Sequence, residues 1–152
     1  MKRNSTRYKR IEHLTTIYEG RVKFNEVDSL GIVWHGHYIS FFEEGREYFG
    51  RKHGLSYLDI KANNYTAPIV NVHCDYKASL KFGDTFTVKT FILDCPSSKL
   101  ILEYEIYNPT GELMCEGRTV QVFLDKNGNL ALYSPDFFTK WKNKVNFFSD
   151  SR

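Results

Sequence analysis

The chain has 152 residues, of which 41% are hydrophobic and 16% aromatic, a length and composition that fit one globular domain with a core of its own. The formal net charge at pH 7 is only +3, and five of the basic residues fall within the first ten positions, so the remainder is nearly neutral. Nucleic-acid binders usually concentrate Lys and Arg on one folded face, so that class of partner is not expected. No stretch approaches the roughly 18 to 20 apolar residues that span a bilayer, so no membrane span is expected.

The three cysteines, Cys74, Cys95 and Cys115, are odd in number, widely spaced, and placed in or beside apolar runs. This pattern is typical of buried free thiols in a reducing compartment rather than of a disulfide framework. No apolar segment of the kind found in secretory leaders follows the basic start. We therefore expect a cytoplasmic location.

The first part of the chain divides into a lead-in, a strand and an irregular segment. Residues 1–15 are polar and basic and are expected to form an arm, while residues 16–148 are expected to form one domain. Residues 17–24 have the composition of a first strand. Residues 25–36 carry turn chemistry at Asp28-Ser29, Gly31 and Gly36, so this segment should be the least regular of the domain.

From residue 38 the apolar period becomes helical. The residues that recur at offsets of three and four are Tyr38, Phe41, Phe42, Gly45, Tyr48 and Phe49. The helix should end near His53-Gly54, because Gly is the usual left-handed stop. Gly45 inside this aromatic stripe predicts a helix pressed closely against a sheet, with the stripe serving as core.

The rest of the chain alternates with period two, which is typical of strands that have one buried face. Four such runs follow the helix, at residues 68–77, 84–94, 99–107 and 112–125. Short turns separate them, so neighbours along the chain should pair antiparallel. The result is an α+β arrangement with the helix across one sheet face, and residues 135–145 add a short terminal helix.

The irregular segment carries a resemblance to a known family. The run FNEVDSLGIVWHGHY at residues 24–38, continued by Phe41, Glu43 and Arg46, resembles the signature of the 4-hydroxybenzoyl-CoA and YbgC-like acyl-CoA thioesterases. The similarity extends more weakly over residues 17 to about 125. It implies the hotdog fold, an antiparallel sheet of about five strands wrapped around a long central α-helix. It also implies hydrolysis of an acyl-CoA to free acid and CoA, without a cofactor.

The resemblance makes Asp28 a catalytic carboxylate that acts either as nucleophile or as general base for water. Both roles are open to an ionised side chain, whereas the residues alone would equally allow Asp28 to cap the turn at residues 29–31. His35 matches a histidine of the YbgC-like branch that orients or polarises the water or the carbonyl. A histidine that is simply hydrogen-bonded at a helix start is the alternative interpretation.

Thioester cleavage does not need a strong general acid, because the leaving group departs as a thiolate. The main requirement is to stabilise the carbonyl oxygen as it becomes negative. The free N–H groups at the start of the predicted helix can do this. The resemblance places the donor near His35 and Gly36. The residues expected to bind substrate beside them are Trp34, Tyr38, Glu43, Pro68 and Ile69.

Three features qualify these expectations. Phe24 stands where YbgC-like enzymes often have Tyr, which shifts the match toward the 4-hydroxybenzoyl-type branch. His35, in contrast, favours the YbgC-like branch. Glu43 and Arg46 match an acidic and a basic position of the family, but an exposed ion pair is an equally good interpretation. No metal is expected, because His35 and His37 lack a third ligand at usable spacing.

The expected partners are an acyl-CoA substrate and further copies of the chain. A sheet of this kind leaves edges to be covered, and hotdog subunits cover them by forming homodimers or homotetramers, in which residues 67–70 would complete the neighbour's site. Three alternative functions stay open: an acyl-carrier-protein thioesterase, a hotdog hydratase or dehydratase, and an acyl-thioester-binding module without turnover. Release of free thiol separates the hydrolases from the other two.

Overall fold

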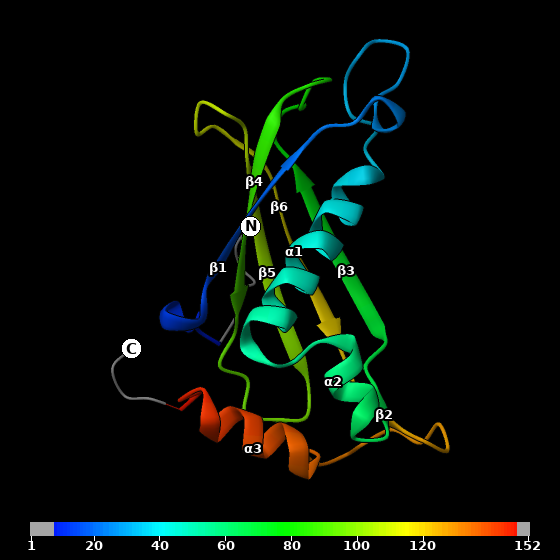
Figure 1. Ribbon diagram of the computed structural model, residues 1–152, viewed down its shortest axis with the longest axis vertical. Coiled ribbons are helices and arrows are strands. Elements are labelled where there is room, and N and C mark those ends of the chain that lie inside the picture. The colour runs from blue at the N-terminus through cyan, green and yellow to red at the C-terminus, as the bar shows by residue number, and fades with distance from the viewer. Residues whose placement is uncertain (1–7, 149–152) are drawn as a thin grey trace.

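The computed structural model describes residues 8–148 and shows one sheet wrapped around one long helix (Figure 1). The helix is α1 (His37–His53), and the strands of the sheet are β1 (Thr16–Arg21), β3 (Ile69–Tyr76), β4 (Thr85–Ile92), β5 (Leu100–Tyr107) and β6 (Leu113–Gln121). The smaller elements are η1 (Glu12–Leu14), η2 (Phe24–Glu26), α2 (Tyr57–Ala62), β2 (Tyr65–Thr66), β7 (Leu124–Asp125) and α3 (Asp136–Lys144). This α+β arrangement is the expected one.

The strands lie in the order β1-β4-β5-β6-β3, and every neighbouring pair is antiparallel. The expectation that all consecutive strands pair is wrong for β3 and β4, because β3 pairs with β6 at the edge of the sheet. Residues 77–84 instead cross from this edge to β4. On the way Lys81 forms an isolated bridge with Ile32, so the crossing connection also holds the irregular segment.

The predicted helix is confirmed, and its close approach to the sheet follows from Gly45. A Cβ at this position would lie 2.7 Å from both Val88 and Thr90 of β4, so only glycine allows this spacing. One turn before Gly45 two aromatic rings stack on the sheet: Phe41 on Phe86 at 4.2 Å and Phe42 on Tyr104 at 4.5 Å. The helix ends at Gly54, whose φ of 76° is the left-handed stop.

Two strand boundaries differ from the prediction. The first strand ends at Arg21 rather than at residue 24, because residues 24–26 turn into η2 and leave Phe24 exposed. The run at residues 112–125 breaks after Gln121, where the Val122 N–H turns to the Pro68 carbonyl and β7 pairs with β2 instead. The predicted terminal helix is confirmed as α3.

The start of the described chain packs on the sheet. Ile11 and Leu14 are buried, and Arg10 makes two 2.9 Å ion pairs, one with Glu103 and one with Glu105 of β5. Residues 8–14 are therefore part of the folded body, although the sequence suggested an arm over residues 1–15. Residues 1–7 of that arm lie outside the described residues.

Over residues 8–148 no helix combines the length and apolar character that crossing a bilayer requires.

Candidate active site

The segment between η2 and α1 is held in one conformation by backbone hydrogen bonds. The Gly31 N–H donates to the Asp28 carbonyl at 3.0 Å and the Asp28 N–H to the Ile32 carbonyl at 2.9 Å, which closes a tight turn. Gly31 adopts a φ of 80°, a conformation that favours glycine. The Asp28 carboxylate accepts the Leu30 N–H at 2.8 Å across the turn. Asp28 therefore does cap the turn, as the alternative interpretation expected. The cap uses one carboxylate oxygen and leaves the other available.

A cavity of about 320 Å³ lies where this turn meets the start of α1 and the end of β3. Its lining consists of Asp28, Ile32, Val33, Trp34, His35, Tyr38, Tyr76, Lys77, Ala78 and Ser79. Four residues expected in the site, Asp28, Trp34, His35 and Tyr38, are therefore brought together. Asp28 is exposed in the single chain, but it lines this cavity and does not simply face bulk water.

Two tyrosines support this cavity. The Tyr38 hydroxyl accepts the Leu80 N–H at 2.9 Å, and burial raises the pKa of Tyr38. The Tyr76 hydroxyl donates to the His35 carbonyl at 2.9 Å, and desolvation, followed by its contact with Cys74, raises the pKa of Tyr76 to about 12. Both hydroxyls therefore stay protonated at neutral pH, and the bond from Tyr76 fixes the backbone just before α1.

In the described part of the chain, two amide groups just before α1 are free, that of His35, which lines the cavity, and that of Gly36, which is not among the lining residues although it was expected in the site. Gly36 is the N-cap residue, and within residues 8–148 the N–H groups of His35 and Gly36 have no acceptor. No acidic side chain occupies the first turn, so the positive end of the helix dipole is not neutralised there. A Cβ on Gly36 would lie 2.1 Å from the Trp34 ring, so glycine is needed for the indole to lie where it does.

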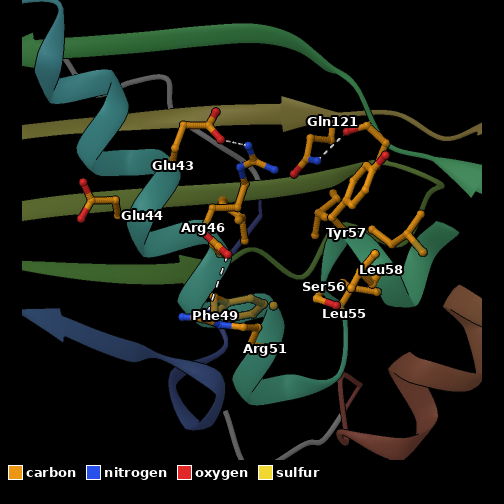
Figure 2. A pocket seen from close by; sticks show the side chains of 16 residues that line it. Glu43, Glu44, Arg46, Phe49, Arg51, Leu55, Ser56, Tyr57, Leu58 and Gln121 are labelled. Carbon is orange, nitrogen blue, oxygen red and sulfur yellow. Dashed lines mark hydrogen bonds and ion pairs between the residues drawn. The ribbon is translucent and has the colours of Figure 1, made fainter. Parts of the chain in front are cut away.

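The expected substrate-binding residues Glu43, Pro68 and Ile69 are not part of this cavity. Glu43 lines a different cavity of about 500 Å³ between α1, α2 and the sheet, where it forms an ion pair with Arg46 (Figure 2). Gln121 of β6, labelled in Figure 2, donates to the Ala67 carbonyl at 2.6 Å. Pro68 and Ile69 lie at the opposite end of β3 from Tyr76, about 24 Å away along an eight-residue strand.

The imidazoles of His35 and His37 pack on the Trp34 ring at centroid distances of 4.9 and 5.4 Å. Among the residues that the structure describes, no three His, Cys, Asp or Glu side chains are grouped so as to hold a metal ion.

Sequence reasoning missed Tyr76 and Lys77 as members of the site. Their approach depends on β3 lying at the sheet edge beside the start of α1, an order that the sequence pattern did not predict. The only signal in the sequence was the weaker family similarity over residues 17 to about 125, which includes both residues.

Comparisons with known proteins support the fold and show the family. The family model of the thioesterase-like superfamily matches residues 22–142. YneP of Bacillus subtilis (strain 168), provisionally named an acyl-CoA thioesterase, is 32% identical over 81% of this chain and 89% of its own length. A 1,4-dihydroxy-2-naphthoyl-CoA hydrolase of Prochlorococcus marinus (strain MIT 9515) is 26% identical over 85% of this chain and 89% of its own. The crystal structure of a DHNA-CoA thioesterase from Staphylococcus aureus superposes with a TM-score of 0.77 and 27% identity, covering 87% of this chain and 91% of that one.

The fold and the cavity together define a hotdog domain in which a carboxylate lies beside the start of the central helix. The chain belongs to the thioesterase-like superfamily, and its class of activity is thioester hydrolysis.

Proposed function

We propose that the protein hydrolyses acyl-CoA thioesters with Asp28 as the central catalytic residue. The observation that carries this proposal is that the Asp28 carboxylate lines the same cavity as His35, whose N–H and that of Gly36 are free at the start of α1. A nucleophile or base and a group of oxyanion donors are the two elements that thioester cleavage needs most.

In the proposed reaction the thioester carbonyl oxygen lies against the free N–H groups of His35 and Gly36. Asp28 then either attacks the carbonyl carbon, which gives an anhydride that water opens, or removes a proton from the attacking water. The sulfur leaves as the CoA thiolate in either case, so a strong general acid is not required. His35 orients the water or the carbonyl, while Trp34 and Tyr38 line the space around them.

Lys77 is the best candidate for recognising the anionic part of CoA. It lines the cavity, and its side chain is about half exposed, at 46%. Its partner Glu116 lies 3.6 Å away in an exposed ion pair, which is a weak interaction that a phosphate can displace. Substitution of Lys77 should therefore raise KM for acyl-CoA more than it lowers kcat.

We also propose that two copies complete each other's sites by pairing their β3 strands. Within residues 8–148 this strand has a neighbour on one side only, and large apolar side chains along it are exposed: Val70 at 59%, Val72 at 41% and Tyr76 at 47%. Antiparallel pairing would place Pro68 and Ile69 of the second copy beside the Tyr76 end of the first. That arrangement would bring to the cavity the two expected residues that a single chain cannot supply.

The pairing is tested with Val72→Lys, which places a charge at an exposed side chain of the edge strand β3. Sedimentation should show a dimer or a dimer of dimers for the unchanged protein and a smaller species for the variant, with loss of thioesterase activity. A monomeric but fully active variant would contradict the shared site. Lys89→Glu on β4, within the sheet, serves as the control for a change of surface charge.

The proposed activity is tested by measuring free-thiol release from aromatic, short, medium and long acyl-CoA substrates, each beside the matching acyl-carrier-protein substrate. Turnover of at least one CoA ester is expected. Turnover of the carrier-protein esters alone would favour the alternative substrate class. Water addition to an unsaturated acyl-CoA without thiol release would favour a hydratase.

A further inference from the structure

Two of the three cysteines meet next to Tyr76, a residue that lines the candidate active site. The sulfur atoms of Cys74 on β3 and Cys115 on β6 lie 3.2 Å apart, and neither is in a disulfide. In the register of the two strands Cys74 lies opposite Gly117 and Cys115 lies opposite Tyr76, so the two thiols are diagonal neighbours on one sheet face. Cys74 is only half-buried, which departs from the expectation of three fully buried thiols, whereas Cys115 has no exposed surface.

The pair is coupled to the cavity through Tyr76. This residue follows Cys74 by two positions, so both side chains point to the same face of β3, and it lies directly opposite Cys115. Its hydroxyl holds the His35 carbonyl at 2.9 Å, and its ring packs edge-on against Tyr38 at 5.5 Å. Any movement of β3 against β6 at the two thiols is therefore passed on to the backbone that precedes α1.

We propose that Cys74 and Cys115 form a peroxide-sensitive thiol pair whose oxidation to a disulfide lowers the activity of the adjacent site. The Cys74 sulfur attacks a hydroperoxide, the O–O bond breaks, and the products are a Cys74 sulfenic acid and an alcohol, or water when the oxidant is hydrogen peroxide. The Cys115 sulfur then attacks the sulfenic sulfur and releases water. Overall the two thiols lose two electrons and two protons, and the peroxide is reduced.

Cys74 reacts first and Cys115 second because the surroundings of the two thiols differ. In the single chain Cys74 is the one of the two that solvent reaches, and the hydrogen bond from Cys115 lowers the pKa of Cys74. The same contact, followed by burial, raises the pKa of Cys115. The lowered pKa favours the thiolate of Cys74, which is the reactive form, while Cys115 stays a thiol until it resolves the sulfenic acid.

The consequence for the site follows from the change in sulfur separation. A disulfide bond is about 2.05 Å long, so its formation draws the sulfurs together by about 1.1 Å from their present 3.2 Å. Tyr76 lies opposite Cys115 and two residues from Cys74 on β3, so it has to follow a movement of β3 against β6. A displacement of about 1 Å in groups that position a reaction can lower the rate by up to about 100-fold.

The experiment treats the reduced full-length protein with hydrogen peroxide and measures three quantities in parallel. Thiols are counted in denaturant, the mass and the peptide map locate any disulfide, and thioesterase activity is followed before and after addition of dithiothreitol. We expect the count to fall from three thiols to one, a Cys74–Cys115 peptide two hydrogens lighter than its reduced form, and a 10- to 100-fold loss of activity that the reductant reverses.

Two variants make the test specific. Cys95→Ser serves as the matched control, because Cys95 is also a buried thiol but contacts Ser97 rather than another cysteine, and it should respond to peroxide as the unchanged protein does. Cys74→Ala should keep its thiols and its activity. If Cys74→Ala loses activity to the same extent, if the unchanged protein keeps three thiols, or if the disulfide includes Cys95, the proposal is overturned. Thiol count and mass do not depend on the proposed function, so a protein without turnover would contradict that function and leave the disulfide result intact.

Discussion

Asp28→Asn is the most informative single change, because the structure separates the structural role of this side chain from its proposed chemical one. Asn keeps an oxygen that can accept the Leu30 N–H, which Asp28 now binds at 2.8 Å, and it is well suited to this type of turn. Since Asp28 is exposed, the free energy of unfolding should change by less than about 0.5 kcal/mol. The amide is neither a competent nucleophile nor a base, so turnover should fall by at least about 100-fold, or about 2.7 kcal/mol in activation free energy.

The assay pairs urea unfolding with thiol release from whichever acyl-CoA the protein prefers. Asp125→Asn is the matched control, because its carboxylate accepts the N–H groups of Asn127 and Asn129 in a turn that lies outside the cavity. It should leave turnover unchanged. A folded Asp28→Asn protein that retains more than half of the original kcat would refute the reasoning and leave Asp28 as a turn cap only.

Three further outcomes follow from the packing. Gly36→Ala should cost little stability, since the half-exposed Trp34 ring can swing away from the new methyl, but the displaced indole should lower kcat/KM measurably in the same thiol assay. Phe42→Ala should lower the free energy of unfolding by about 3–5 kcal/mol in urea titrations, because the buried ring stacks on Tyr104 at 4.5 Å. Burial lowers the pKa of His53, so the unfolded chain binds this proton more readily and stability should fall as the pH drops below about 6.5; His53→Asn should flatten that part of a Tm-against-pH profile.

The central helix was predictable because its signals are local and agree with one another. The aromatic stripe has helical spacing, Gly45 allows the close approach, and Gly54 supplies the stop. The short helix α2 was missed, although Ser56 and Asp59 cap it reciprocally, because six residues give too little period to distinguish a helix from a loop.

The order of the strands was harder to predict from the sequence, because no local pattern shows where a connection crosses the sheet. Residues 77–84 have the turn chemistry of a hairpin, yet they carry the chain from one edge to an interior strand. The side of the cavity that the turn at Asp28 and the start of α1 form was therefore predicted from the sequence. Tyr76 and Lys77 could be assigned to the cavity only once the position of β3 in the sheet was known.

The two edges of the sheet are not alike, and this limits how far assembly can proceed. The outer strand β1 carries exposed Glu19 and Arg21, charges that oppose the addition of another strand, whereas β3 carries exposed Val70 and Val72 beside His73 and Asp75. If two copies pair through β3 about a two-fold axis, as proposed, both β3 edges are covered and the two β1 edges face outward. Edge-to-edge growth of the sheet then stops at the pair instead of propagating into a fibre.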